Sequence, residues 1–256
     1  MQPLLYFSYG MTKTGSTLAF ELVRSALDLC GYPQDRLDLD VIAADANVNF
    51  VNHISETQLQ TLWDEVEKRG YPIVLKTHTR PKPHIVKMIR AGKAIAHAGY
   101  RDPRDMLLSL LDHGKRAREA GKKSFSNLHT TAEALENIRQ QHNTLTAWLR
   151  LPATMPLYFE DVAFDMEATT QKLIDRLGLK IDASIVVDVV LSQRFTQKNK
   201  GLRLRYPDEM SPDLSAEIKA EFAPLFERFI TNRHDLKNTR RILLPKPYEL
   251  RTSAPD

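Results

Sequence analysis

The sequence contains little cysteine and no long apolar run. Cys30 is the one cysteine among 256 residues, so a disulfide within the chain is excluded, which is typical of proteins from reducing compartments. No apolar stretch approaches the roughly 20 residues that a membrane-spanning helix needs. The N-terminus lacks a basic region, and its apolar run is too short for a signal peptide. We therefore expect a cytoplasmic protein without membrane association.

A strong charge of either sign is also absent. Lysine and arginine number 36 and aspartate and glutamate 32, which leaves a net charge of +4. This excess suits an anionic ligand but is too small to indicate nucleic-acid binding. The hydrophobic content of 42% is that of a soluble globular protein. Without repeats or low-complexity tracts, we expect one domain over residues 1–256, with a proline-containing, loosely ordered tail at 241–256.

A glycine-containing loop near the N-terminus predicts a phosphate-binding turn. The apolar run Leu4–Phe7 predicts a buried strand, and apolar residues at helical spacing predict a helix over residues 18–29. Between them, Gly10 and Gly15 would let the backbone approach an anion, and the helix start would offer unpaired N–H groups. The alternative is an ordinary helix N-cap after a buried strand.

The spacing Gly10-x4-Gly15 matches a Walker A loop, but the next position does not. Ser16 stands where that motif requires lysine, and the loop lysine is Lys13 instead. The loop is therefore predicted to hold phosphate without being arranged like that of an ordinary ATPase.

A second apolar run ends in two cationic residues. Ile73–Leu75 leads directly into Lys76-Thr77-His78. Side chains two apart on a strand share a face, so Lys76 and His78 should point the same way, at a strand end where α/β proteins bind ligands. The alternative is a pair of cations in solvent, although they would repel each other unless an anion lay between them.

A third predicted strand, residues 94–100, ends at Arg101. Asp102 is a good N-cap for the helix that follows, and Asp105 would complete a start resembling a capping box. This helix carries Ser109. A guanidinium can grip a phosphate with two hydrogen bonds, so Arg101 is a candidate phosphate ligand, the alternative being a surface salt bridge.

The remaining pattern completes an alternation of strands and helices. The polar residues 35–53 are a candidate wall of an acceptor site, or a solvated connection. The segment 197–205 holds four cations and is either a ligand-binding segment or a flexible basic loop. A fourth strand is predicted at 155–161, and further helices at 55–68, 81–91, 130–151, 166–177, 183–191 and 211–229.

Four motifs together resemble the sulfotransferases that use 3′-phosphoadenosine-5′-phosphosulfate (PAPS). Residues 13–17, Lys-Thr-Gly-Ser-Thr, are similar to the family's Lys-Ser-Gly-Thr-Thr loop, and residues 76–78 are identical to its Lys-Thr-His motif. Residues 101–105 resemble its Arg-Asn-Pro-x-Asp signature, with Ser109 at the family's spacing of eight. Residues 159–161, Phe-Glu-Asp, resemble its Tyr-Glu-Asp strand end, and residues 199–201, Asn-Lys-Gly, partly match its Arg-Lys-Gly segment.

The resemblance implies a three-layer α/β/α fold with a central parallel sheet, like that of P-loop NTPases. It implies transfer of a sulfuryl group from PAPS to a hydroxyl or amine of a small-molecule acceptor, with 3′,5′-adenosine bisphosphate (PAP) as product. His78 would be the general base, and Lys13 and Lys76 would stabilise charge. The residues that would bind the nucleotide are Lys13, Thr14, Gly15, Ser16, Thr17, Leu18, Arg101, Ser109, Phe159, Lys200 and Gly201.

Two departures from the family pattern concern the adenine. Leu18 stands where cytosolic members often have tryptophan, and Phe159 stands at the tyrosine position. The base is therefore expected to be held by other contacts.

Two other classes of function remain as alternatives. A P-loop small-molecule kinase would need lysine at position 16 and a carboxylate for Mg²⁺. A non-enzymatic binder of RNA or another polyanion would use the basic tracts and would not need His78. We expect no metal requirement and no nucleic-acid partner, and leave a homodimer open.

Overall fold

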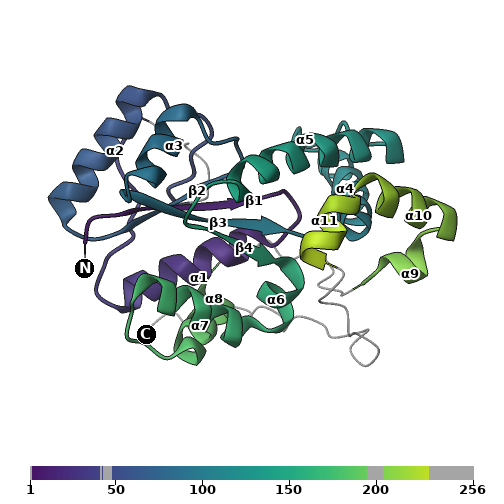
Figure 1. Cartoon of the computed structure of the whole chain (residues 1–256). Coiled ribbons are helices and arrows are strands. Elements are labelled where there is room, and N and C mark those ends of the chain that lie inside the picture. Colours follow the sequence, from purple (N-terminus) through teal and green to yellow (C-terminus); the bar gives the residue numbers. More distant parts are fainter. Residues whose placement is uncertain (1, 41, 43–47, 195–203, 231–256) are drawn as a thin grey trace.

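The computed structural model describes residues 2–40, 42, 48–194 and 204–230 (Figure 1). Its sheet has four parallel strands in the order β2-β1-β3-β4. Because the chain passes from β1 outward to β2 and then back across to β3, the carboxyl ends of β1 and β3 flank a position where α/β proteins bind ligands. The strands are β1 (Leu5–Gly10), β2 (Ile73–Thr77), β3 (Ala94–Tyr100) and β4 (Thr154–Tyr158).

Helices cover both faces of the sheet, which confirms the predicted three-layer α/β/α class. Figure 1 shows α1, α7 and α8 on one face and α2, α3 and α5 on the other. None of the helices in these described ranges is long and apolar enough to cross a membrane. The helices are α1 (Ser16–Leu29), α2 (Glu56–Arg69), α3 (Pro83–Arg90), α4 (Pro103–Glu119), α5 (Thr131–Leu149), α6 (Phe159–Phe164), α7 (Met166–Leu177), α8 (Ala183–Gln193), α9 (Tyr206–Glu209), α10 (Pro212–Glu221), α11 (Ala223–Leu225) and the π-helix η1 (Phe226–Ile230).

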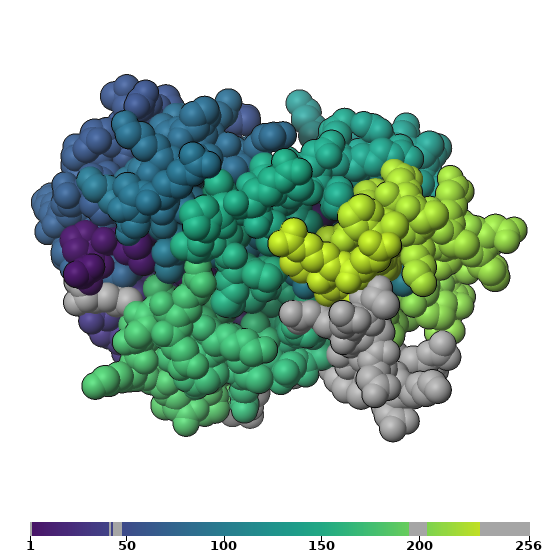
Figure 2. All heavy atoms as spheres, viewed as in Figure 1, coloured from purple at the N-terminus to yellow at the C-terminus, as the bar shows by residue number. Residues whose placement is uncertain are grey.

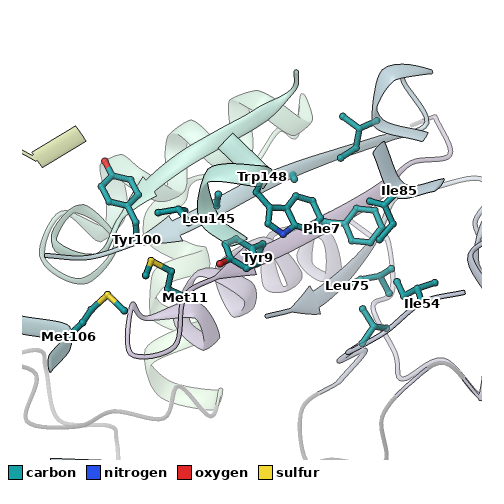
Figure 3. Packing of buried hydrophobic residues seen from close by; sticks show 14 of the residues in the cluster. Phe7, Tyr9, Met11, Ile54, Leu75, Ile85, Tyr100, Met106, Leu145 and Trp148 are labelled. Atoms are coloured by element: carbon teal, nitrogen blue, oxygen red, sulfur yellow. The ribbon is translucent and has the colours of Figure 1, made fainter. Parts of the chain in front are cut away.

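The residues of β1 divide between two hydrophobic cores because successive side chains on a strand point to opposite faces. Phe7 and Tyr9 pack against Trp148 of α5, with ring centroids 5.7 and 5.5 Å apart (Figure 3). Tyr6 belongs to the other core, with the apolar faces of α1, α7 and α8. The central strand, which leads into the glycine-containing loop, is thus buried on both faces.

The C-terminal helices pack against α4. Figure 2 shows them in yellow-green as a lobe beside the teal helices of the central part of the chain. Arg104 of α4 lies 3.5 Å from the Tyr206 ring and 4.9 Å from the Phe226 ring, measured from its guanidinium carbon to each ring centroid. These stacked contacts anchor α9 and η1 to the start of α4.

Three predicted details are wrong. Asp102 caps α4 by accepting from the N–H of Arg104 at 2.9 Å, but Asp105 does not complete a capping box. Its carboxylate instead accepts from the N–H groups of residues 205 and 206. The predicted strand at 155–161 ends at Tyr158, and Phe159 begins α6. The predicted helix 211–229 is interrupted, because Pro224 lacks an N–H group and cannot continue it.

Candidate phosphate-binding site

The loop between β1 and α1 has the backbone of an anion-binding turn. Lys13 and Gly15 both lie in the left-handed region, with φ of 66° and 69°. The hydroxyl of Thr14 donates to the carbonyl of Met11 at 2.6 Å and closes the loop from inside. Gly15, the N-cap of α1, has no side chain to cap the first turn, and that turn contains no acidic residue. The positive end of a 14-residue helix therefore faces the loop.

Close packing explains three glycines around this turn. A Cβ atom on Gly10 would lie 2.7 Å from Cβ of Ser16, and one on Gly99 of β3 would lie 3.3 Å from Cα of Gly10. A Cβ atom on Gly15 would lie 3.0 Å from the ring of Phe159. The loop is thus folded tightly over β1 and β3, and Phe159 covers one side of it.

Lys76 reaches this loop from β2. Its Nζ donates to the hydroxyl of Thr17 at 2.7 Å, and the residue is only 2% exposed. Burial lowers the pKa of the ammonium to about 8, and Glu21, one turn further along α1, acts in the opposite direction. A desolvated cation is therefore held beside the first turn of α1.

His78 reaches the same loop two residues later. Its Nδ1 lies 2.6 Å from the carbonyl oxygen of Gly10. Because a carbonyl can only accept, Nδ1 carries the proton and Nε2 of the neutral ring has a free lone pair. Burial lowers the pKa of this imidazole to about 4, against the opposing effect of the hydrogen bond to Gly10 and with a smaller contribution from the charge of Lys76. The ring is therefore neutral at pH 7. It packs against the ring of Phe50, with ring centroids 5.7 Å apart.

Arg101 lies on the opposite side of the loop, at the end of β3. Its guanidinium stacks 4.0 Å from the centroid of the Phe159 ring and donates to the carbonyl of Lys13 at 3.4 Å. A second nitrogen pairs with Asp105 at 3.5 Å. Phe159 and Arg101 thus form one stacked unit against the loop.

Ser109 is buried on the face of α4 that is turned to the loop. Residues four apart on a helix share a face. Asp105, one turn before Ser109, contacts Arg101, and His113, one turn after it, contacts Lys13. Ser109 therefore lies on α4 between the residue that contacts Arg101 and the residue that contacts Lys13.

Two residues that the sequence did not single out also touch the loop. His113 Nδ1 lies 3.2 Å from Nζ of Lys13. The side-chain oxygen of Gln141 on α5 accepts from the N–H of Thr12. The helical spacing from Ser109 could have identified His113, whereas no sequence signal links Gln141 to a loop 129 residues away.

Part of the predicted basic segment can be placed. Lys200 and Gly201 lie outside the described residues. Arg205, also counted among its cations, is buried and pairs with Glu209 at 2.6 Å and Asp112 at 3.0 Å. Because carboxylates already engage it, Arg205 has a structural role.

A parallel sheet whose first strand runs through a glycine-containing loop into a helix places the chain among the P-loop-like α/β folds. Within this class, the chain has the sulfotransferase fold. Mouse sulfotransferase SULT7A1, crystallised with PAP, superposes with a TM-score of 0.58 at 12% identity, over 91% of this chain and 88% of that chain. Retinol dehydratase, crystallised with androsterone and the inactive cofactor PAP, gives 0.55 at 14% identity, over 89% and 82%.

A bacterial sulfotransferase from Alicyclobacillus acidocaldarius gives a TM-score of 0.51 at 20% identity, over 92% of this chain and 98% of that chain. No family model matches the chain, and a search of curated proteins finds no relative. The likeness at these identities is one of fold, so the activity must be argued from the site.

Proposed function

We propose that this chain is a sulfotransferase that moves a sulfuryl group from PAPS to a hydroxyl or amine of a small-molecule acceptor. The observation that carries the proposal is the arrangement at the loop. A neutral histidine whose Nε2 carries the unprotonated lone pair lies there beside a buried lysine, and a second lysine belongs to the loop itself.

The charges of the site fit a donor with several anionic groups. Burial, together with the charges of Arg116 and Arg101, lowers the pKa of Lys13 to about 8 against an opposing effect of Asp112. Cations held together in this way are stabilised by an anion among them. The start of α1 adds backbone N–H groups to the same place. A 5′-phosphosulfate and a 3′-phosphate would supply further negative charge to these cations.

PAPS supplies an activated sulfuryl group, joined to its 5′-phosphate through a bridging oxygen. In our proposal, His78 Nε2 takes the proton of the acceptor as its oxygen or nitrogen bonds to sulfur. Lys76 holds the nonbridging sulfuryl oxygens. Lys13 neutralises the charge that grows on the bridging oxygen as the bond from sulfur to that oxygen breaks.

The other residues hold the nucleotide in place, which aligns the reacting atoms. We propose that the backbone of residues 15–18 and the hydroxyls of Ser16 and Thr17 bind the 5′-phosphate. Arg101 and Ser109 bind the 3′-phosphate from the other side of the loop. Phe159 supports the Arg101 guanidinium by stacking. Lys200 and Gly201 stay assigned to the nucleotide on the strength of the resemblance.

Calorimetric titration tests the donor site. The purified chain is titrated with PAP, AMP, and ATP, each with and without Mg²⁺ and EDTA. We expect PAP to bind at micromolar concentration or tighter, AMP much more weakly, and EDTA to have no effect. Tighter binding of ATP with Mg²⁺ would indicate a kinase-like site and contradict the proposal. Transfer of ³⁵S from labelled PAPS to a panel of alcohols, phenols and amines then identifies the acceptor class.

A further inference from the structure

The side chain of Lys13 is held by an uncharged partner on α4. Its Nζ lies 3.2 Å from Nδ1 of His113. A lysine ammonium can only donate, so Nδ1 of His113 is the unprotonated nitrogen and the neutral ring carries its proton on Nε2. This is the tautomer opposite to that of His78, whose Nδ1 donates to a carbonyl.

The charges around His113 keep it neutral. Burial lowers the pKa of its imidazole to about 4, and Lys13, Arg116 and Lys122 act in the same direction. Arg101 and Arg116 lie near Lys13 and lower the pKa of its ammonium, whereas the carboxylate of Asp112 raises it. Asp112 is paired with Arg205 at 3.0 Å, so part of its charge is already compensated.

Packing fixes the orientation of the His113 ring. The ring of Phe125 meets it edge to face, with centroids 4.9 Å apart and planes at 88°. The residue after His113 is Gly114, where a Cβ atom would lie 2.4 Å from the carbonyl oxygen of Leu128. The segment 125–128 is therefore pressed against α4 at this turn, and His113 presents Nδ1 to the loop from a rigid support.

We infer that His113 is a positioning residue that aims the Lys13 ammonium at the donor's 5′-phosphate and leaves its charge uncompensated. The inference rests on the proposed function. A carboxylate at this position would hold the ammonium equally well but would cancel the charge that the phosphate needs. An apolar side chain would preserve the charge but would not orient it. A neutral imidazole does both, because it accepts a hydrogen bond without contributing a negative charge.

The test is the pH dependence of PAP affinity, measured by calorimetry between pH 7 and 10. Lys76 is unchanged in all His113 variants, so a difference between their pH profiles reports Lys13. In the parent protein, affinity should fall as the pH rises above about 8, the pKa of Lys13. In His113→Leu the charged ammonium loses a hydrogen bond. The alkaline fall in affinity should therefore begin about one pH unit lower, with affinity about fivefold weaker than that of the parent protein at pH 8.

Two further variants separate positioning from simple structural support. His113→Gln offers a neutral carbonyl acceptor and should restore the parent profile to within about threefold. His113→Asp offers a charged acceptor, so PAP should bind more weakly at pH 7 while the alkaline fall moves to higher pH. A merely structural role would not move the profile in opposite directions for leucine and aspartate.

The outcomes distinguish this inference from the function on which it rests. If the parent protein binds PAP and His113→Leu retains the parent profile, the positioning role is wrong and the donor site stands. If His113→Gln behaves like His113→Leu while both unfold at the parent temperature, the acceptor role of Nδ1 is likewise overturned. If the parent protein does not bind PAP, the proposed function and the inference fall together.

Discussion

His78 has one ring nitrogen bonded to a carbonyl, and its other ring nitrogen has no hydrogen-bond partner among the described residues, which is the state a general base requires. We predict that His78→Ala lowers turnover by about 10²- to 10⁴-fold. PAP affinity should change little, because the nucleotide contacts lie elsewhere in the loop. Transfer of ³⁵S and calorimetry measure the two effects separately. His129→Ala, an exposed histidine, is the matched control. Near-normal turnover of His78→Ala would show that another group takes the proton.

The shifted pKa values predict a broad pH optimum. His78 must be unprotonated and is so above its lowered pKa of about 4, so kcat/KM should fall as the pH drops through that value. Lys13 and Lys76 must be protonated, and their pKa values are lowered to about 8, so kcat/KM should fall again as the pH rises through 8. An acid limb near pH 6.5, the ordinary histidine value, would contradict the lowered pKa of His78.

Arg101 and Arg104 stand three residues apart and should respond differently to alanine. Arg101→Ala should weaken PAP binding by about 1.5–3 kcal/mol, the range for a hydrogen bond to a charged group, and leave AMP binding nearly unchanged. AMP lacks the 3′-phosphate that we assign to this guanidinium. Calorimetry with both nucleotides measures the difference. An equal loss for PAP and AMP would place Arg101 on a group that the two share.

Arg104→Ala should instead destabilise the fold. Arg104 pairs at 2.6 Å with Asp102, which is fully buried. Removing one partner of a buried pair leaves an uncompensated charge, at a cost of about 3–5 kcal/mol. Thermal and denaturant unfolding measure this change. Folded Arg104→Ala protein should still bind PAP more tightly than AMP, as the parent protein does.

The sequence grouped those candidate site residues that local spacing relates. Arg101 with Ser109 and Lys76 with His78 could be paired because helix and strand geometry relate residues a few positions apart. The partners of these residues could not be predicted. Thr17 accepts from Lys76 across 59 positions, and Gly10 accepts from His78 across 68. Such contacts depend on the order of strands, which local patterns do not specify.

At the scale of the element, α4 connects the phosphate loop to the C-terminal lobe. One face carries Asp105, Ser109 and His113, and the carboxylate of Asp105 accepts from the backbone of residues 205 and 206 at 2.9 and 3.0 Å. The same carboxylate pairs with Arg101. A substitution at residues 204–206 that moves Asp105 should therefore also alter the position of the Arg101 guanidinium.

Gly114 tests how closely the segment after α4 is packed on it. Alanine favours helices over glycine by about 1 kcal/mol, so a solvent-facing site would gain stability. At Gly114 the added methyl would lie 2.4 Å from a backbone oxygen, and we expect Gly114→Ala to lose about 1–3 kcal/mol. Urea unfolding measures the change. Gly121→Ala, in open space at φ 62°, should cost about 1–2 kcal/mol from left-handed strain alone.

The elements themselves were largely predictable. The helix at Glu56–Arg69 has a strong apolar period, and Ser55 supplies its predicted N-terminal boundary. The errors occurred where no periodicity distinguishes the alternatives. Phe159 could extend a strand or begin a helix, and packing on Gly15 and Arg101 decides for the helix.

At the scale of the whole molecule, Trp148 joins α5 to the sheet. It is fully buried against Phe7 and Tyr9, and its Nε1 donates to the carbonyl of Thr79 at 2.9 Å. Trp148→Ala should destabilise the fold by about 3–5 kcal/mol. Trp148→Phe, which keeps most of the packing and loses the hydrogen bond, should cost clearly less. Denaturant unfolding of both variants measures the difference. Equal losses of stability would contradict the importance of the cavity that Trp148→Ala leaves.

Lys76 of β2 lies between Ser8 of β1 on one side and Phe50 on the other. The contact with the segment around Phe50 bears on aggregation. β2 is a terminal strand of the sheet, a position that normally exposes N–H and C=O groups to other chains. At Lys76 those groups are taken by Asn49 and Val51, at 3.0 and 2.8 Å. A strand from another molecule must first displace residues 49–51. The lysine of the site is therefore shielded from intermolecular β-pairing by the same segment that places Phe50 beside His78.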